Sequence, residues 1–221
     1  MAPVIIAIDG PAGSGKSSVS KQVAREKNFG YLDTGAAYRA LAWASLNLPG
    51  FSLKELENKD LAESFAYSIS IDPDNYWVRV GETDITQAIR DTEVAEFVSQ
   101  VARIPAVRSY MKALTHQIVA QSGRLGVIVE GRDITTVIAP EAPVRILLTA
   151  SEAVRLKRRS AELSESAAAR VVRQVTERDA SDSKVVDFTT PAPGVQLVDT
   201  SDLNFNQSVS AVLALIEQGL S

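Results

Sequence analysis

At 221 residues, 45% of them hydrophobic, the chain is long enough to bury a core, and its length suits one α/β domain that carries an insertion. Its formal net charge of −4 provides no positive field for broad nucleic-acid binding, so we expect no nucleic-acid partner. The absence of cysteine excludes disulfides and thiolate metal sites. No segment has the length of a membrane span or the pattern of a signal peptide, so we expect a cytoplasmic protein without a membrane partner.

Apolar runs and helical spacing alternate along most of the chain. The apolar runs predict strands buried on both faces of a parallel sheet, at residues 4–8, 127–129, 144–148 and 195–198. Between and after them, apolar residues recur with helical spacing, as in Val19 and Val23 and, near the end, Val209, Val212 and Ile216. Such alternation predicts an α/β fold with a mostly parallel sheet flanked by helices.

The middle of the chain has a different pattern, with strand-like alternation on both sides of a turn at residues 72–75. A helix pattern follows from Val94 to Val101, with Asp91 or Thr92 as its N-cap, and Pro105 should end it. We therefore expect an inserted hairpin and helix at residues 61–103, within a core formed by residues 1–60 and 104–221.

A glycine-rich segment directly follows the first predicted strand, and it matches the phosphate-loop pattern G-x-x-x-x-G-K-[ST] without a deviation. In this pattern backbone N–H groups surround the phosphates, the lysine reaches the β- and γ-phosphates, and the last hydroxyl ligates Mg²⁺. The residues expected to hold ATP are Gly10, Pro11, Ala12, Gly13, Ser14, Gly15, Lys16, Ser17 and Ser18, with Ser17 as the Mg²⁺ ligand.

Neither the N-K-x-D nor the D-x-x-G pattern of a GTPase occurs, which favours a small-molecule kinase. An acceptor phosphate must then approach the phosphates of ATP, and each pair of like charges about 4 Å apart costs on the order of 4 kcal/mol at an effective dielectric of 20. Arginines at loop positions offset this repulsion. Arg132 follows the predicted strand at residues 127–129, and Arg39 follows a strand-like segment at residues 31–33 and a turn. The attacking phosphate oxygen is already anionic, so the lone histidine, His116, is expected to be a bystander.

A basic helical stretch at about residues 155–178 has few large apolar residues. It could be a solvated helix face, or a lid that closes over ATP and excludes water. Its basic residues are Arg155, Lys157, Arg158, Arg159, Arg170, Arg173 and Arg178.

Five motifs give the chain a resemblance to the bacterial cytidylate kinases along nearly its whole length: IAIDGPAGSGKSS, YLDTGAAYRALA, SQVARIPAVR, VIVEGRDITTVIAPEAPVRILLTAS and ERDASDS. The resemblance implies the fold of a P-loop nucleoside monophosphate kinase, with an inserted monophosphate-binding subdomain and a short lid. It also implies transfer of the γ-phosphoryl group of ATP to CMP or dCMP. Nothing in the sequence requires more than a monomer.

The resemblance further implies a role for each matching residue. Thr34, Arg39 and Arg132 would hold the CMP phosphate, while Ser99, Arg108 and Asp133 would contact the cytosine edge. Arg178 and Asp182 would contact the sugar, and Arg158 and Arg159 would lie near ATP. The catalytic residues would be Lys16, Arg39, Arg132 and Arg158. The family pattern Asp-Ser-x-Arg departs here at Val185, which removes an arginine from the expected monophosphate site.

Other functions remain open on the sequence alone. The nearest alternative is a kinase for another monophosphate, chiefly UMP, and the trio Ser99, Arg108 and Asp133 would discriminate it. A second is a regulatory nucleotide-binding module without transfer activity. A nucleic-acid-binding protein is disfavoured by the acidic composition.

Overall fold

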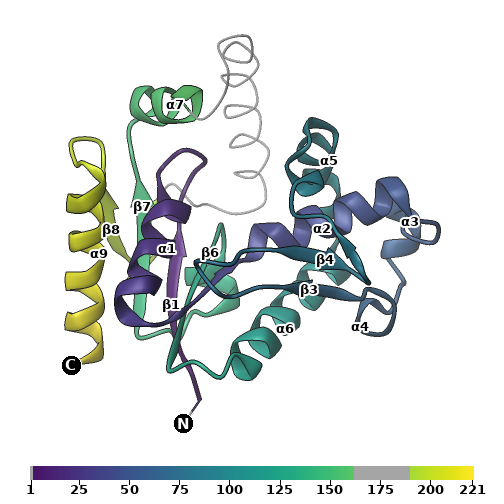
Figure 1. Cartoon of the computed structure of the whole chain (residues 1–221), viewed down its shortest axis with the longest axis horizontal. Helices are drawn as coiled ribbons and strands as arrows, with labels where there is room; N and C mark the ends of the chain where they lie inside the picture. Colours follow the sequence, from purple (N-terminus) through teal and green to yellow (C-terminus); the bar gives the residue numbers. More distant parts are fainter. Residues whose placement is uncertain (1, 162–189) are drawn as a thin grey trace. The chain divides into compact units, whose positions relative to one another are not determined.

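A computed structural model describes residues 2–161 and 190–221 (Figure 1). The chain divides into two compact units. We call the first, Met1–Tyr31 with Arg124–Ser221, the sheet unit, and the second, Leu32–Gly123, the hairpin unit. Each unit is described by itself. Within the described residues, no helix is long and apolar enough to span a membrane.

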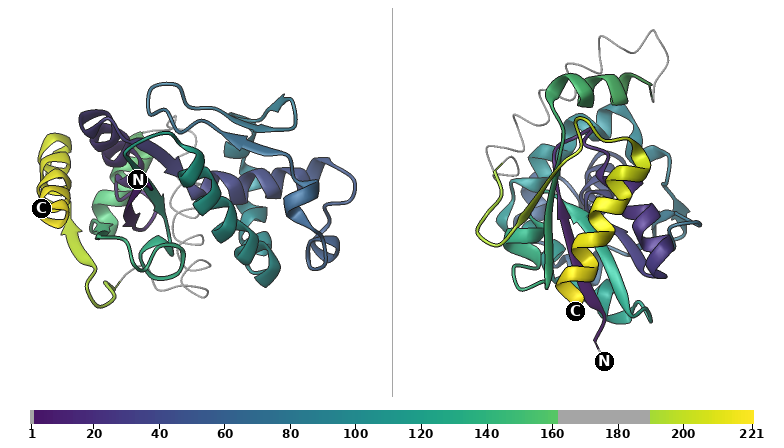
Figure 2. Two further views of the ribbon diagram at one scale, coloured as in Figure 1. Left: turned by 90° about the horizontal axis from the view of Figure 1, so that it is seen from below. Right: turned by 90° about the vertical axis from the view of Figure 1, so that its left-hand side faces the viewer.

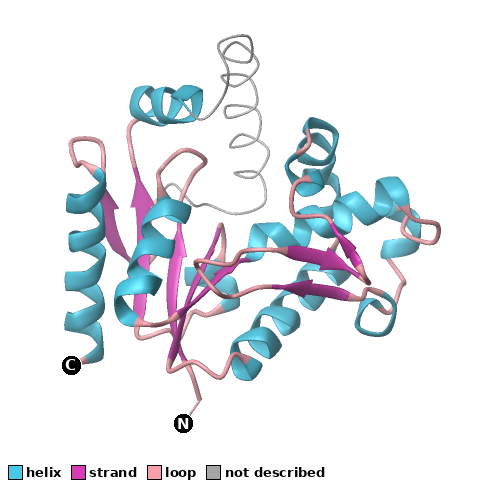
Figure 3. Cartoon of the chain, viewed as in Figure 1, coloured by secondary structure: helices cyan, strands magenta, loops and turns pink. Residues whose placement is uncertain are grey.

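The sheet unit is built on five strands in the order β2-β6-β1-β7-β8 (Figure 3). These strands are β1 (Val4–Asp9), β2 (Gly30–Asp33, which crosses the unit boundary), β6 (Gly126–Gly131), β7 (Val144–Thr149) and β8 (Gln196–Asp199). β1 pairs in parallel with both β6 and β7, and β7 pairs in parallel with β8. Because parallel strands end at the same edge of a sheet, Asp9, Gly131 and Thr149 share one edge.

The helices of the sheet unit are α1 (Lys16–Lys27), α7 (Glu152–Ala161) and α9 (Phe205–Leu220). α1 and α9 pack against each other, and they contact β6 and β7 respectively (Figures 1 and 2). A short π-helix, η2 (Ile134–Ile138), contacts β1, β6 and β7. The four strands predicted from apolar runs are confirmed to within two residues at their ends, because burial on both faces leaves a strong pattern. The helix predicted from Val209 to Ile216 is confirmed as part of the longer α9.

The hairpin unit combines helices with a small antiparallel sheet in the order β3-β4-β5. Its elements are α2 (Thr34–Asn47), α3 (Leu53–Leu56), α4 (Leu61–Ser64), β3 (Tyr67–Ile69), β4 (Val78–Val80), β5 (Thr83–Asp84), η1 (Ala88–Arg90), α5 (Thr92–Ala102) and α6 (Pro105–Gln121). The predicted hairpin and following helix are confirmed, and Pro105 opens α6 after α5 has ended at Ala102. The strand β5 has only two residues and left no alternation to recognise.

One apolar core holds the hairpin unit together, and it includes residues of α2, α5 and α6 as well as of the hairpin. Leu41 on α2, Ile89 on η1 and Val101 on α5 are fully buried in it. This packing makes the compact unit, residues 32–123, wider than the insertion expected at residues 61–103. The sequence pattern marked where strand character begins, whereas the extent of the core depends on contacts between distant helices.

Candidate functional site

The phosphate loop lies between the buried strand β1 and the start of α1 at Lys16. Glycine is required at two of its positions. A Cβ on Gly10 would lie 2.1 Å from the carbonyl oxygen of Leu148, and Gly13 has φ +75°, where a side chain is strained. The first backbone N–H groups of α1 have no partner within the helix, so this turn presents donors and a positive dipole end to an anion.

Two arginines of α7 hold the phosphate loop by its carbonyl groups. Arg155 Nη1 donates to the carbonyl oxygen of Ala12 at 3.0 Å, and Arg158 Nη1 donates to that of Ser14 at 3.1 Å. A carbonyl that accepts from an arginine is oriented towards it, which fixes the rotation of the adjoining peptide groups. The arginines therefore contribute to the shape of the loop.

Arg158 also reaches the segment after β8. It donates to the Thr200 hydroxyl and carbonyl oxygens, each at 2.9 Å, and to the Leu203 carbonyl oxygen at 3.4 Å. Thr200 is buried, and its hydroxyl lies 2.9 Å from the Thr149 carbonyl oxygen, to which it can donate. Arg158 thus joins α7, the phosphate loop and the end of the sheet, while its expected contact with ATP stays a prediction.

Of the other basic residues of this stretch, Arg170, Arg173 and Arg178 lie outside the described residues. Lys157 is exposed on α7, and Arg159 belongs to the same helix. Arg178 and Asp182, expected to contact the sugar, lie outside the described residues, as do Val185 and most of the expected lid.

A buried carboxylate lies beside Ser17 of the phosphate loop. Glu130, 1% exposed near the end of β6, accepts from the Ser17 hydroxyl at 2.6 Å and from the Tyr31 hydroxyl at 2.7 Å. Among the described residues, no three or more Asp, Glu, His or Cys side chains group into a metal site. Mg²⁺ bound with a nucleotide needs only one or two protein oxygens besides phosphates and water, so Ser17 with Glu130 fits that ion.

Arg132 and Asp133 follow β6 and lie next to the start of the phosphate loop. Arg132 Nη1 donates to the carbonyl oxygen of Gly10. Asp133 is 7% exposed and precedes the short helix η2. The two residues expected to contact the acceptor are thus attached to the same edge of the sheet as the phosphate loop.

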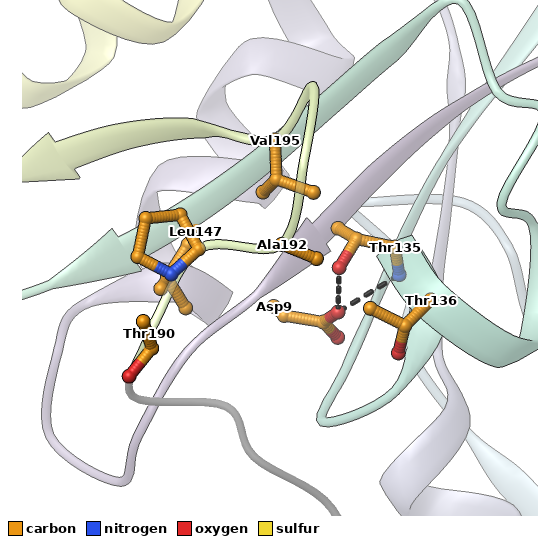
Figure 4. A pocket seen from close by; sticks show the side chains of 8 residues that line it. Asp9, Thr135, Thr136, Leu147, Thr190, Ala192 and Val195 are labelled. Carbon is orange, nitrogen blue, oxygen red and sulfur yellow. Dashed lines mark hydrogen bonds between the residues drawn. The ribbon is translucent and has the colours of Figure 1, made fainter.

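Asp9, the last residue of β1, holds the segment that follows them. Its carboxylate accepts from the backbone N–H groups of Ile134 and Thr135 at 2.9 and 2.8 Å, and from the Thr135 hydroxyl at 2.6 Å. Figure 4 shows the carboxylate facing Thr135. Burial raises the pKa of Asp9, the hydrogen bonds from Thr135 and Ile134 oppose that rise, and the nearby Asp133 charge adds to it.

The other predicted acceptor residues belong to three helices of the hairpin unit that pack together. Asp33 caps α2 by accepting from Ala36 N at 3.2 Å, and it pairs with Arg39 Nη2 at 2.7 Å. Thr34 is buried at the first position of the same helix. The remaining two, Ser99 on α5 and Arg108 on α6, are half-buried.

The Arg39 region also contains a buried phenol. Burial raises the pKa of Tyr67 well above its usual value, with smaller increases from Tyr76, Asp33 and Tyr110 and a decrease from Arg39. An ordinary tyrosine is already neutral at pH 7, so the raised pKa extends the neutral form of Tyr67 to more alkaline pH.

Each unit therefore brings part of the predicted set together. The sheet unit gathers Lys16, Ser17, Arg132, Asp133 and Arg158, and the hairpin unit gathers Thr34, Arg39, Ser99 and Arg108. Sequence reasoning missed three residues that support the first group, namely Asp9, Tyr31 and Thr200. Only Asp9 left a signal, because a carboxylate between an apolar strand and a glycine turn is unusual.

Comparisons with known proteins agree in their family. The family model described as cytidylate kinase matches residues 6–218. A cytidylate kinase of Cutibacterium acnes is 41% identical over 219 residues, which cover 97% of this chain and 96% of the relative. A cytidylate kinase of Mycobacterium leprae is 39% identical over 224 residues, which cover 99% of this chain and 97% of the relative.

Solved structures agree with the fold. A crystal structure of a kinase-like protein from Chloroflexus aurantiacus matches with a TM-score of 0.50 and 17% identity, covering 100% of both chains. At that identity the likeness shows the fold alone.

Proposed function

The chain belongs to the cytidylate kinase family and is an ATP-dependent nucleoside monophosphate kinase; we propose that it transfers the γ-phosphoryl group of ATP to CMP or dCMP, giving ADP and CDP or dCDP. The observation that carries the proposal is the hydrogen bond from Arg132 to the carbonyl oxygen of Gly10. It attaches an acceptor-side arginine to the first residue of the loop that holds the donor phosphates.

On the donor side, Lys16 and the N–H groups of the loop hold the phosphates of ATP. Lys16 is half-buried at the start of α1, where its charge adds to the positive end of the helix. Arg155 and Arg158 fix the loop from its carbonyl side. Because these groups are in place before the nucleotide arrives, little reorganisation is needed at the moment of transfer.

On the acceptor side, arginines of both units supply positive charge. Arg132 in the sheet unit and Arg39 in the hairpin unit bind the phosphate of CMP, with Thr34 beside Arg39. The guanidinium fork suits phosphate oxygens, and it offsets the repulsion between acceptor and donor. Asp33 holds the Arg39 guanidinium with a hydrogen bond of 2.7 Å, which limits its rotamers.

The base is selected by hydrogen-bond polarity. The Asp133 carboxylate accepts from the exocyclic amine of cytosine, whereas uracil would present a carbonyl oxygen to it. Ser99 and Arg108 complete the contacts to the base from α5 and α6. Uracil would leave two acceptors facing each other, which a buried site penalises.

Mg²⁺ would be held by the Ser17 hydroxyl, with the buried Glu130 carboxylate behind it, and it would neutralise charge on the β- and γ-phosphates. Glu130 accepts a hydrogen bond from the Ser17 hydroxyl, which leaves the lone pairs of that oxygen for the ion. Tyr31 donates to the same carboxylate oxygen and fixes its position. The transfer itself needs no general base, since the attacking phosphate oxygen is already anionic.

We also propose that the enzyme is cytoplasmic and that it acts as a monomer, because one chain supplies every proposed site residue. The net charge of −4 disfavours a nucleic-acid partner. Sedimentation at working concentration tests the monomer. A dimer whose dissociation abolished turnover would contradict it.

The decisive experiment compares acceptors. ADP release coupled to a reporter reaction is measured with CMP, dCMP, UMP and AMP, and we expect CMP or dCMP to give the highest kcat/KM. Asp133→Asn should reduce the preference for CMP over UMP by about tenfold or more. The carboxylate only accepts hydrogen bonds, whereas the amide can accept from cytosine or donate to uracil. Asp202→Asn, an exposed aspartate of the same unit, is the matched control. Faster turnover of UMP or AMP by the unmodified enzyme would contradict the proposal.

A further inference from the structure

Asp9 is a buried acid whose three hydrogen-bond donors all come from the segment after Arg132 and Asp133. It is 2% exposed. Burying a carboxylate is costly unless its oxygens accept hydrogen bonds, so the groups that donate to it show which segment it supports. The position therefore requires an explanation in the segment that Asp9 holds.

That segment is the first turn of η2, and Asp133 is its N-cap residue. An aspartate at an N-cap ordinarily accepts from the first free N–H groups of its own helix. The Asp133 side chain makes no such hydrogen bond. The N–H groups of Ile134 and Thr135 are bound instead by Asp9, which comes from β1.

The capping contact needs a carboxylate in particular. Oδ1 accepts from Ile134, and Oδ2 accepts from both donors of Thr135, so the two oxygens both act as acceptors. An asparagine offers one acceptor and one NH₂ donor, and its NH₂ group would face an N–H or O–H donor. An aspartate is thus the residue that satisfies this turn from across the sheet.

A second set of contacts holds the same turn through its carbonyl group. Arg145 Nη1 donates to the Thr135 carbonyl oxygen at 3.3 Å, and Arg145 Nη2 donates to that of Pro193 at 3.2 Å. Arg132, just before the turn, donates to Gly10, the neighbour of Asp9. The backbone on both sides of Asp133 is therefore fixed to β1 and its loop.

We propose that Asp9 is a positioning residue for acceptor selection, because it caps the η2 turn in place of Asp133 and so keeps the Asp133 carboxylate from folding back onto Ile134 and Thr135. This inference rests on the proposed function, in which Asp133 contacts cytosine. In this proposal Asp9 acts through Asp133 and not by contact with the substrate. Without it, the N–H groups of the turn compete with the base for the Asp133 carboxylate.

The test measures acceptor and donor constants separately in Asp9→Asn. We expect the KM for CMP to rise about tenfold or more and the CMP-to-UMP ratio of kcat/KM to fall by a similar factor, as when a group that orients a ligand-binding residue is removed. The KM for ATP should stay within about twofold. Asp60→Asn is the matched control, since Asp60 caps α4 by accepting from Ala62 N and Glu63 N on an exposed helix.

Thr135→Val provides a second, isosteric variant that removes only the 2.6 Å hydrogen bond to Asp9. We expect the CMP-to-UMP ratio to fall about threefold, in proportion to the loss of one buried hydrogen bond. If Asp9→Asn does not fold by circular dichroism, this variant decides.

An unchanged CMP-to-UMP ratio in the folded variants would overturn the inference, as would equal losses in the constants for CMP and ATP. Failure of the proposed function is a separate result, because it would appear as an unmodified enzyme that does not prefer CMP or dCMP.

Discussion

The two units fix their functional residues by different means. In the sheet unit, buried polar groups bind one another across the strand ends, as Asp9 does with Thr135 and Glu130 with Ser17. In the hairpin unit, an apolar core fixes three helices, on which Arg39, Ser99 and Arg108 are half-buried. Hydrogen bonds fix both the distance and the direction between two groups, whereas apolar packing mainly supplies stability.

This contrast predicts that polar changes in the sheet unit affect activity more than stability, and that apolar changes in the hairpin unit do the reverse. The following variants test it in order of decreasing expected effect.

Lys16→Ala should reduce kcat by at least about a hundredfold, because it removes a preorganised charge from the transferring phosphate. The denaturation midpoint should change little, since Lys16 is half-buried at a helix start. Lys27→Ala is the matched control on the same helix, where the lysine pairs with Glu217 at the surface. Equal activity in the two variants would refute the role of Lys16.

Leu41→Ala should destabilise the protein by about 2–5 kcal/mol, because Leu41 is fully buried in the core of the hairpin unit. Urea denaturation measures the loss, and the KM for ATP of the folded fraction should be unchanged. Leu125→Ala, at a leucine that is 85% exposed, serves as the control. A loss below about 1 kcal/mol would show that this core does not dominate the stability of its unit.

Thr200→Val should raise the KM for ATP about threefold, because it removes one of the acceptors that hold Arg158 against the phosphate loop. The KM for CMP should change less. Thr115→Val tests the comparison directly, since Thr115 is equally buried but donates to the Met111 carbonyl oxygen within α6. A rise in the KM for ATP from Thr115→Val would break the contrast between the units.

The smallest expected effect is a pH dependence at Asp199. Hydrogen bonds from Ser201 lower the pKa of Asp199 below 3.8, so its contribution to stability is present above pH 3.8 and is lost as the pH falls through the folded-state pKa. The stability difference between the unmodified protein and Asp199→Asn should therefore shrink on acidification, as measured by urea denaturation.

The pH dependence of stability expected from Asp9 has the opposite sign. Burial raises the folded-state pKa of Asp9 above 3.8. Its ionisation therefore favours the unfolded chain as the pH rises from 3.8 through the folded-state pKa. A stability difference at Asp199 that grew on acidification would contradict the sign given for that residue.

Local patterns predicted the phosphate loop and the strands, because both depend on neighbours in sequence. The residues that support the loop depend on partners far along the chain. Ser17 and Glu130 are 113 positions apart, and Tyr31 and Glu130 are 99 apart. No spacing rule connects such positions, so the sequence alone predicts neither of these hydrogen bonds.

The partners of the basic stretch at residues 155–178 also depend on segments far away in the sequence. Its sequence allowed a solvated face or a lid, and neither alternative included arginines that bind the carbonyl groups of the phosphate loop. The N–H groups of a guanidinium can donate either to an anion or to a carbonyl oxygen. Which of them it meets depends on the three-dimensional neighbourhood.

The sheet unit is discontinuous along the chain, since Tyr31 and Arg124 are separated by the whole hairpin unit. The central strand β1 is synthesised more than a hundred residues before its neighbours β6 and β7. We therefore expect the hairpin unit to complete its core during synthesis before β1 can pair with β6 and β7. Until then, an apolar strand followed by a glycine-rich turn is a natural target for chaperones.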